Sequence, residues 1–211
     1  MIERVAYHLG KNDEEPNIAL AIQLCETKDS EGIKEIIAGL KNKNQQVAND
    51  CIKVLYEIGE RNPKLIAGYV FEFIQLLKSR DNRLVWGGMT ALSKITFLKP
   101  KEVFENINVV VRAYENGSVI TRDNSISVFA ELAKADQKHE KILVKRLIDH
   151  LKTCRSKEVG QHAERAFICI NASNSEEFMT VLLQRRENLT DAQKKRLDKL
   201  IHKIENGEFT S

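Results

Sequence analysis

Histidine and cysteine are the residue types in this chain that would point most specifically to a transition-metal site. The five histidines and four cysteines are scattered along the sequence. Only His150 and Cys154 have a suitable spacing, because residues four apart lie on one face of a helix, as paired metal ligands do. The sequence offers no evident third ligand, and a zinc site needs three or four. The favoured interpretation is therefore unrelated side chains and no metal site.

Side-chain sets for catalysis are not evident either. His162 has no adjacent serine or cysteine nucleophile in a recognisable motif. Arg122 and Asp123 are neighbours in sequence, so on a helix they point away from each other and form a poor dyad. The sequence contains neither a Walker phosphate-binding loop nor a GxGxxG motif. We therefore expect no enzyme activity and no cofactor.

Trp86, the single tryptophan, is the residue best suited to contact a partner. Its equivalents in the other repeats described below are all polar: Asn49, Asp123 and Gln161. Tryptophan is favoured at interfaces because it buries a large area at low entropic cost. Arg80 and Arg83 lie just before it, and such a cluster suits an acidic or nucleic-acid partner. The competing interpretation is that Trp86 folds over the edge of its own repeat.

These residues belong to a helical pattern that recurs four times. The copies begin at Val47, Leu84, Thr121 and Val159, at intervals of 37, 37 and 38 residues. A fixed period of this size predicts a solenoid, in which each repeat buries its apolar face against its neighbours. Each copy carries a small residue four positions on, which we expect at a close helix–helix contact: Cys51, Gly88, Ser125 and Ala163.

A second helix accompanies each copy, and its apolar residues recur every 37 residues from one repeat to the next. Its apolar residues are spaced i, i+3, i+4, i+7, which is one face of an α-helix. We expect a short helix at about 2–10 and a single domain, 1–211, that ends in a capping helix. The expected hairpins lie at about 15–42, 44–79, 81–116, 118–154 and 156–187, and the capping helix at about 190–206.

Composition indicates a solvated helical protein. The chain has 211 residues, of which 42% are hydrophobic and 30% charged, and its net charge is +3. No stretch approaches the roughly 20 apolar residues that would span a membrane, and the N-terminus lacks the apolar run of a signal peptide. The cysteines form no CxxC motif. We therefore expect free thiols, a cytoplasmic location and no membrane partner.

The repeated frame resembles HEAT repeats over about residues 15–187. The resemblance rests on the pattern Val-x-x-x-small-x-x-Ala-Leu-x-x-Ile, followed by a second amphipathic helix. Thr121-Arg122 matches the family's frequent Val-Arg pair, whereas Ala48, Val85 and Gly160 depart from it at the Arg position. Tetratricopeptide repeats fit less well, since their period is about 34 residues and their Trp-Leu-Gly-Tyr frame is absent. Helical RNA-reading repeats require base-reading side chains that are not found.

The resemblance implies an all-α, right-handed α-solenoid of about five HEAT-like hairpins with terminal capping helices. It also implies a non-enzymatic scaffold or adaptor that binds another protein, and we expect a monomer. The second helices of a HEAT stack line its concave side. The candidate partner-binding residues are therefore Trp86, Arg83, Arg80, Glu72, Gln75, Arg112 and Arg146.

Two other functions remain open. One is nucleic-acid binding, as in the HEAT-like alkylpurine DNA glycosylases that the chain resembles, with Asp123, Arg122 and Trp86 as its only plausible parts. A groove that follows phosphates is uniformly basic, whereas the concave positions here carry mixed charge, so nucleic acid is possible but disfavoured. Segment 185–203 carries a net charge of +4, which we expect to be the solvated face of a cap. The other is an accessory role for a larger enzyme.

Overall fold

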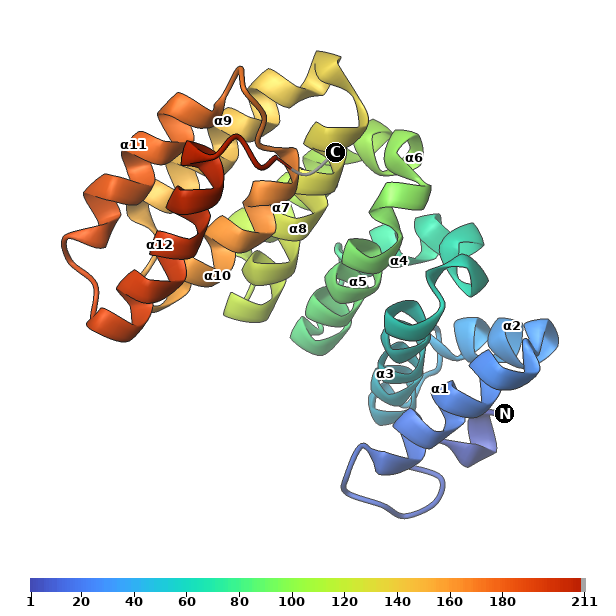
Figure 1. The fold of residues 1–211 in the computed structure, drawn as a ribbon. Coiled ribbons are helices and arrows are strands. Elements are labelled where there is room, and N and C mark those ends of the chain that lie inside the picture. The colour runs from blue at the N-terminus through green and yellow to red at the C-terminus, as the bar shows by residue number, and fades with distance from the viewer. Residues whose placement is uncertain (210–211) are drawn as a thin grey trace. The chain divides into compact units, whose positions relative to one another are not determined.

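A computed structural model describes residues 1–209, which form α-helices joined by short turns (Figure 1). Within these residues there are twelve α-helices and no strand. The first six are α1 (Glu15–Thr27), α2 (Ser30–Gly39), α3 (Gln45–Arg61), α4 (Val70–Leu76), α5 (Asn82–Ile95) and α6 (Pro100–Glu105). The others are α7 (Ile107–Asn116), α8 (Val119–Ala135), α9 (Gln137–Thr153), α10 (Ser156–Ala166), α11 (Ser175–Arg186) and α12 (Asp191–Glu205). Short 3-10 helices lie at Ile2–Arg4, Pro63–Leu65, Ala67–Tyr69, Thr96–Leu98 and Phe167–Cys169.

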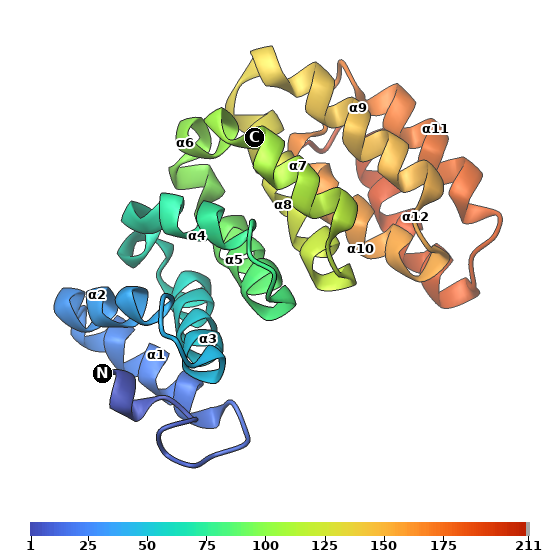
Figure 2. The same ribbon diagram turned by 180° about the vertical axis from the view of Figure 1, so that it is seen from behind.

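The chain divides into two compact units, Met1–Ser125 and Ile126–Ser211, with the boundary inside α8. In the first unit, α3 packs against α1 and α2 and also against α5, and α4 packs on α5 (Figure 2). The apolar face predicted for α3 forms the centre of this core. Cys51, Val54, Leu55 and Ile58 are all fully buried.

The predicted close approach at Gly88 is confirmed. A Cβ atom on this residue would lie 2.9 Å from Cβ of Leu76 and 3.1 Å from the backbone oxygen of Phe73. The adjacent Gly87 is as tight, because its Cβ would lie 2.7 Å from Cγ1 of Ile52. The two glycines therefore let α5 approach α4 on one side and α3 on the other.

In the second unit, α9 packs against α10 and α11, and α12 packs against the same two helices. The core contains Phe178, Leu182 and Leu197, each fully buried. A capping box begins α12, since the backbone N–H of Thr190 donates to Oε1 of Gln193 over 3.0 Å. This box satisfies an amide group that a helix start leaves without a partner.

The helix expected at about 2–10 is much shorter in the structure. A 3-10 helix covers only Ile2–Arg4, and turns follow it. The backbone N–H of Ala6 donates to Oδ1 of Asn17, and that of Tyr7 donates to Oδ2 of Asp50, at 2.9 and 2.8 Å. These side chains replace the carbonyl partners that would have continued a helix.

The thiols and the membrane expectation can be compared directly with the structure. The four cysteines are free, and burial raises the pKa of Cys51 and of Cys169 to about 12. Within residues 1–209, no helix has both the length and the apolar composition needed to cross a membrane.

Candidate partner-binding site

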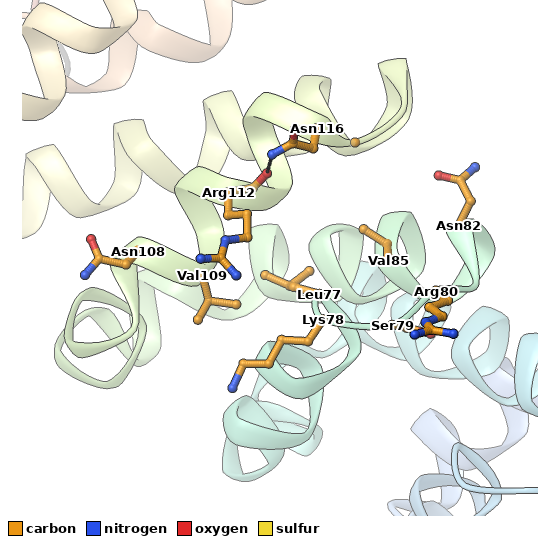
Figure 3. Close-up of a pocket in the computed structure, with 11 residues that line it drawn as sticks. Leu77, Lys78, Ser79, Arg80, Asn82, Val85, Asn108, Val109, Arg112 and Asn116 are labelled. Carbon is orange, nitrogen blue, oxygen red and sulfur yellow. Dashed lines mark hydrogen bonds between the residues drawn. The ribbon is translucent and has the colours of Figure 1, made fainter.

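A groove of about 550 Å³ opens between the end of α4, the start of α5 and α7 (Figure 3). Its lining residues all belong to the first unit: Leu77, Lys78, Ser79, Arg80, Asn82, Val85, Asn108, Val109, Arg112, Asn116 and Gly117. Leu77 and Val85 are 7% and 9% exposed, so they form an apolar floor. In Figure 3, Arg112 and Val109 extend from α7 toward Leu77. The result is an open, partly apolar groove rather than a closed cavity.

The groove rim is positively charged. Lys78, Arg80 and Arg112 are all exposed, and no aspartate or glutamate is among the lining residues. Across residues 1–209, none of these three cations forms an ion pair, and the Lys78 ammonium donates to the neutral amide of Gln75 over 3.2 Å. An unpaired cation next to an apolar floor favours a ligand that carries a carboxylate or phosphate.

Local hydrogen bonds fix both edges of this groove. On one side, the hydroxyl of Ser79 accepts from the backbone N–H of Asp81 over 3.0 Å, and Asp81 caps α5 by accepting from the N–H of Arg83 over 2.7 Å. On the other, the amide of Asn116 donates to the backbone oxygen of Arg112 over 3.0 Å at the end of α7. Hydrogen bonds between side chains and the backbone therefore hold both the turn from α4 to α5 and the last turn of α7 in place.

Trp86 lies outside this groove and is half-buried. Its ring packs at 5.7 Å from the ring of Tyr56 on α3, with an angle of 48° between the planes. The guanidinium of Arg83 lies 5.8 Å from the Trp86 ring and also binds Glu14 over 2.6 Å. The arginine beside the tryptophan is therefore already paired.

Lys53 connects this cluster to the rest of α3. The residue is 7% exposed, and its ammonium binds Glu14 over 2.9 Å and Glu57 over 2.8 Å. Burial alone would lower the pKa of Lys53, but the hydrogen bonds that its ammonium donates to the two carboxylates outweigh burial and raise that pKa. For Glu57, burial alone would raise the pKa, but hydrogen bonds from Lys53 and Arg61 lower it. Each cation of this network is paired with a carboxylate, as expected of a structural contact.

The structure does not gather the seven candidate residues into one site. Arg80 and Arg112 line the groove, and Arg83 and Trp86 belong to the neighbouring cluster. Glu72 is half-buried and Gln75 exposed on α4, and neither lines the groove. Arg146 lies in the second unit, with its guanidinium 5.8 Å from the ring centre of Phe129.

Sequence reasoning missed five polar groove residues: Lys78, Ser79, Asn82, Asn108 and Asn116. Lys78 follows directly after Leu77, the last residue of an apolar stripe, and Arg112 lies two positions before Tyr114, the last residue of the next stripe. The groove could have been predicted from polar residues at the ends of successive second helices, because neighbouring repeats bring those ends together.

Several cations named for the nucleic-acid alternative already have partners. Nε of Arg122 donates to the backbone oxygen of Tyr114 over 3.5 Å. In segment 185–203, Arg186 binds Asp198 over 2.6 Å, and Arg196 binds Glu164. Much of the basic charge expected on this cap is therefore paired with acidic groups.

His150 and His162 require a correction. Nε2 of His150 lies 2.8 Å from Nδ1 of His162 in a buried hydrogen bond, so the interpretation of unrelated histidines is wrong at this pair. The thiol of Cys154 lies in the same cluster, and burial raises its pKa to about 11. This contact could not be predicted from the sequence, because His162 belongs to the next helix, α10, and only packing brings it to α9.

Several solved structures that are similar to this chain belong to engineered or designed proteins. No protein-family model and no curated protein sequence matches the chain. An engineered protein of known crystal structure is 18% identical, with a TM-score of 0.63 over 99% of this chain and 98% of that chain. A designed armadillo repeat protein in complex with the peptide (KR)4 is 12% identical, with a TM-score of 0.68 over 95% and 90%. A second designed armadillo repeat protein is 14% identical, with a TM-score of 0.63 over 96% and 99%.

These likenesses establish the fold. With the helices described above, they confirm the predicted class, an all-α solenoid built from helical repeats. Identities this low carry nothing about activity.

Proposed function

We propose that this chain is a non-enzymatic scaffold of HEAT type that binds another protein. Its partner contributes an acidic, extended segment to the groove between α4, α5 and α7. One observation carries the proposal: Lys78, Arg80 and Arg112 border an apolar floor, and within residues 1–209 neither an ion pair nor a lining carboxylate neutralises them. The proposal includes a single repeat domain over 1–211, a monomer and a cytoplasmic location.

The groove chemistry fits a peptide that combines acidic and apolar side chains. Leu77, Val85 and Val109 can bury apolar side chains, and burial of apolar area contributes about 25 cal/mol per Å². Arg80 and Arg112 can each bind a carboxylate through two parallel N–H donors. The exposed amides of Asn82 and Asn108 supply donors and acceptors for an extended backbone, whose own groups lack partners.

The similar designed protein offers a contrast in charge. The structure of the armadillo repeat protein described above is a complex with the basic peptide (KR)4. In the present chain the groove rim carries three cations, so a basic peptide would meet repulsion rather than attraction. We therefore assign the opposite charge to the partner segment.

A direct binding assay tests the proposal. A fluorescent peptide of alternating glutamate and leucine is titrated with the full chain, beside a lysine–leucine peptide and a single-stranded oligonucleotide of matched charge. We expect only the acidic peptide to bind well, and Arg80→Glu with Arg112→Glu to weaken it by about 10-fold or more, because two attractive pairs become repulsive. Reversal of two exposed cations outside the groove, Lys43→Glu with Lys64→Glu, is the matched control.

Two results would reject this function. One is equal loss of binding in the groove variant and in the matched control, which would reduce the effect to overall charge. The other is tighter binding of the oligonucleotide than of the acidic peptide, which would favour the nucleic-acid alternative.

A further inference from the structure

A buried pair of histidines in the second unit lies beside a thiol. His150 on α9 and His162 on α10 are 6% and 0% exposed, and their ring nitrogens are 2.8 Å apart. Cys154 follows at the C-terminal end of α9. One ring nitrogen from each histidine and the Sγ of Cys154 lie within 4.8 Å of one another.

We propose that His150, Cys154 and His162 form a binding site for one divalent zinc ion. Two imidazoles and a thiolate suit a borderline-soft ion such as zinc, whereas calcium and magnesium prefer oxygen ligands. Typical bonds are about 2.0–2.1 Å from zinc to nitrogen and about 2.3 Å from zinc to sulfur. In a tetrahedron these lengths place the two nitrogens about 3.3 Å apart and each nitrogen about 3.6 Å from the sulfur. The present 2.8 Å between nitrogens requires an opening of about half an ångström, which small side-chain rotations supply.

Local structure already holds the ligands on one side. His150 and Cys154 are four residues apart, and the backbone N–H of Cys154 donates to the carbonyl of His150 over 2.8 Å. Arg185 of α11 binds the carbonyls of Leu151, Lys152 and Cys154 over 2.9, 2.7 and 2.6 Å. Arg185 therefore acts as a positioning residue, because it fixes the turn that carries the thiol.

The protons balance for binding to the neutral cluster. In the neutral histidine pair, one ring nitrogen carries the shared proton, and the other accepts it. Metal binding needs a lone pair on each facing nitrogen, so the donor imidazole moves its proton to its outer nitrogen. The thiol loses its proton to solvent as the sulfur–metal bond forms. With two neutral imidazoles and one thiolate, the bound cluster has a charge of +1.

Three protein ligands leave a fourth position open for water or another small ligand. The site differs in this respect from closed structural zinc sites, which usually have four protein ligands. It lies within the second unit, whereas the proposed peptide groove lies in the first, so the two proposals are independent.

Cobalt(II) is the probe that tests this site, because its spectrum reports thiolate coordination directly. The full chain is treated with a chelator, freed of it, and titrated with cobalt and then with zinc. We expect one equivalent of cobalt to produce a thiolate-to-cobalt charge-transfer band in the near ultraviolet and strong visible bands of four-coordinate cobalt. One equivalent of zinc should remove both.

Substitutions then assign the ligands. Cys154→Ser should abolish the charge-transfer band, and His162→Gln should weaken cobalt binding by at least about 100-fold, since loss of a direct ligand exceeds the effect of an outer-sphere change. Cys25→Ser, which alters a half-buried thiol in the first unit, is the matched control and should leave the spectrum unchanged. Circular dichroism checks that each variant is folded.

The wild-type titration is decisive without any variant. Absence of the charge-transfer band at saturating cobalt would overturn the proposal, and the cluster would be a hydrogen-bonded histidine pair only. A band that survives Cys154→Ser would overturn it as well, since the sulfur ligand would then be another cysteine.

Discussion

Replacement of Gly88 by alanine gives a sharp test of the packing described for the first unit. The new Cβ would lie 2.9 Å from Cβ of Leu76 and 3.1 Å from the backbone oxygen of Phe73, two atoms that cannot move without a shift of α4. Gly160 in α10 is the matched control. Its new Cβ would lie 2.8 Å from Cδ of Arg196, which is part of a long flexible side chain.

The two substitutions gain the same helix propensity but differ in the cost of overpacking. Alanine in a helix interior is favoured over glycine by about 1 kcal/mol, and this gain applies to both positions. Overpacking against a fixed neighbour costs about 1–3 kcal/mol, so Gly88→Ala should be destabilising by roughly 0–2 kcal/mol. At Gly160, Arg196 can move away at the cost of an exposed ion pair with Glu164, which is worth about 0–1 kcal/mol. Gly160→Ala should therefore be neutral or stabilising by up to about 1 kcal/mol.

Urea unfolding followed by circular dichroism measures both variants. We expect Gly88→Ala to unfold at lower urea than Gly160→Ala, with a difference of up to about 3 kcal/mol in the free energy of unfolding. Gly88→Leu should be worse than Gly88→Ala, because it adds three more carbon atoms at the same contact. If Gly88→Ala stabilised the protein as much as Gly160→Ala, the argument for a tight contact between α4 and α5 would be refuted.

Three further predictions concern the first unit. Tyr56→Ala should shift the fluorescence of Trp86 to longer wavelength and increase its quenching by acrylamide, because the tyrosine ring covers one part of the indole; unchanged quenching would contradict this. Lys53→Met should lower the free energy of unfolding by roughly 1–3 kcal/mol, since it leaves partly buried Glu57 with one cation fewer, as chemical denaturation would measure. The pKa of Glu57 is lower in the folded chain than its ordinary value of 4.5. The stability that the Glu57 carboxylate contributes is therefore present above pH 4.5 and is lost as the pH falls through the folded pKa. In an acid titration, Lys53→Met should lose less of its free energy of unfolding over this range than the wild type does. Asp29→Ala should cost about 1 kcal/mol in a thermal or urea melt, because the carboxylate caps α2 by accepting from a backbone N–H over 2.8 Å.

The helical framework could be predicted because its signals are local. The small residues Cys51, Gly88, Ser125 and Ala163 were found by their common spacing, and all four are buried. A period of 3.6 residues decides which side of a helix faces the core, and nearby prolines and caps decide where the helix begins. The N-terminal segment escaped prediction because the partners of its backbone, Asn17 and Asp50, are distant in sequence.

The sites could be predicted only in part because they depend on how separate helices meet. Arg80 and Arg112 were candidates from the sequence, yet nothing in it showed that they border one groove with Lys78. Trp86 was a candidate because the equivalent positions of the other repeats are polar. The ring that covers it, that of Tyr56, belongs to α3 of the preceding repeat, and the sequence did not show this contact. His162 is twelve residues from His150 and meets it across the contact of α9 with α10.

Methyl NMR of the full chain, titrated with the alternating glutamate–leucine peptide, tests the central claim most directly. Three apolar residues that line the groove have methyl groups that report contact with a bound peptide: Leu77 and Val85 of the floor, and Val109 of α7. We predict that these signals shift together and saturably, while those of the second unit, such as Leu182 and Leu197, stay in place. Shifts confined to the second unit, or no saturable shift at these three residues, would contradict the assignment of this groove as the partner-binding site.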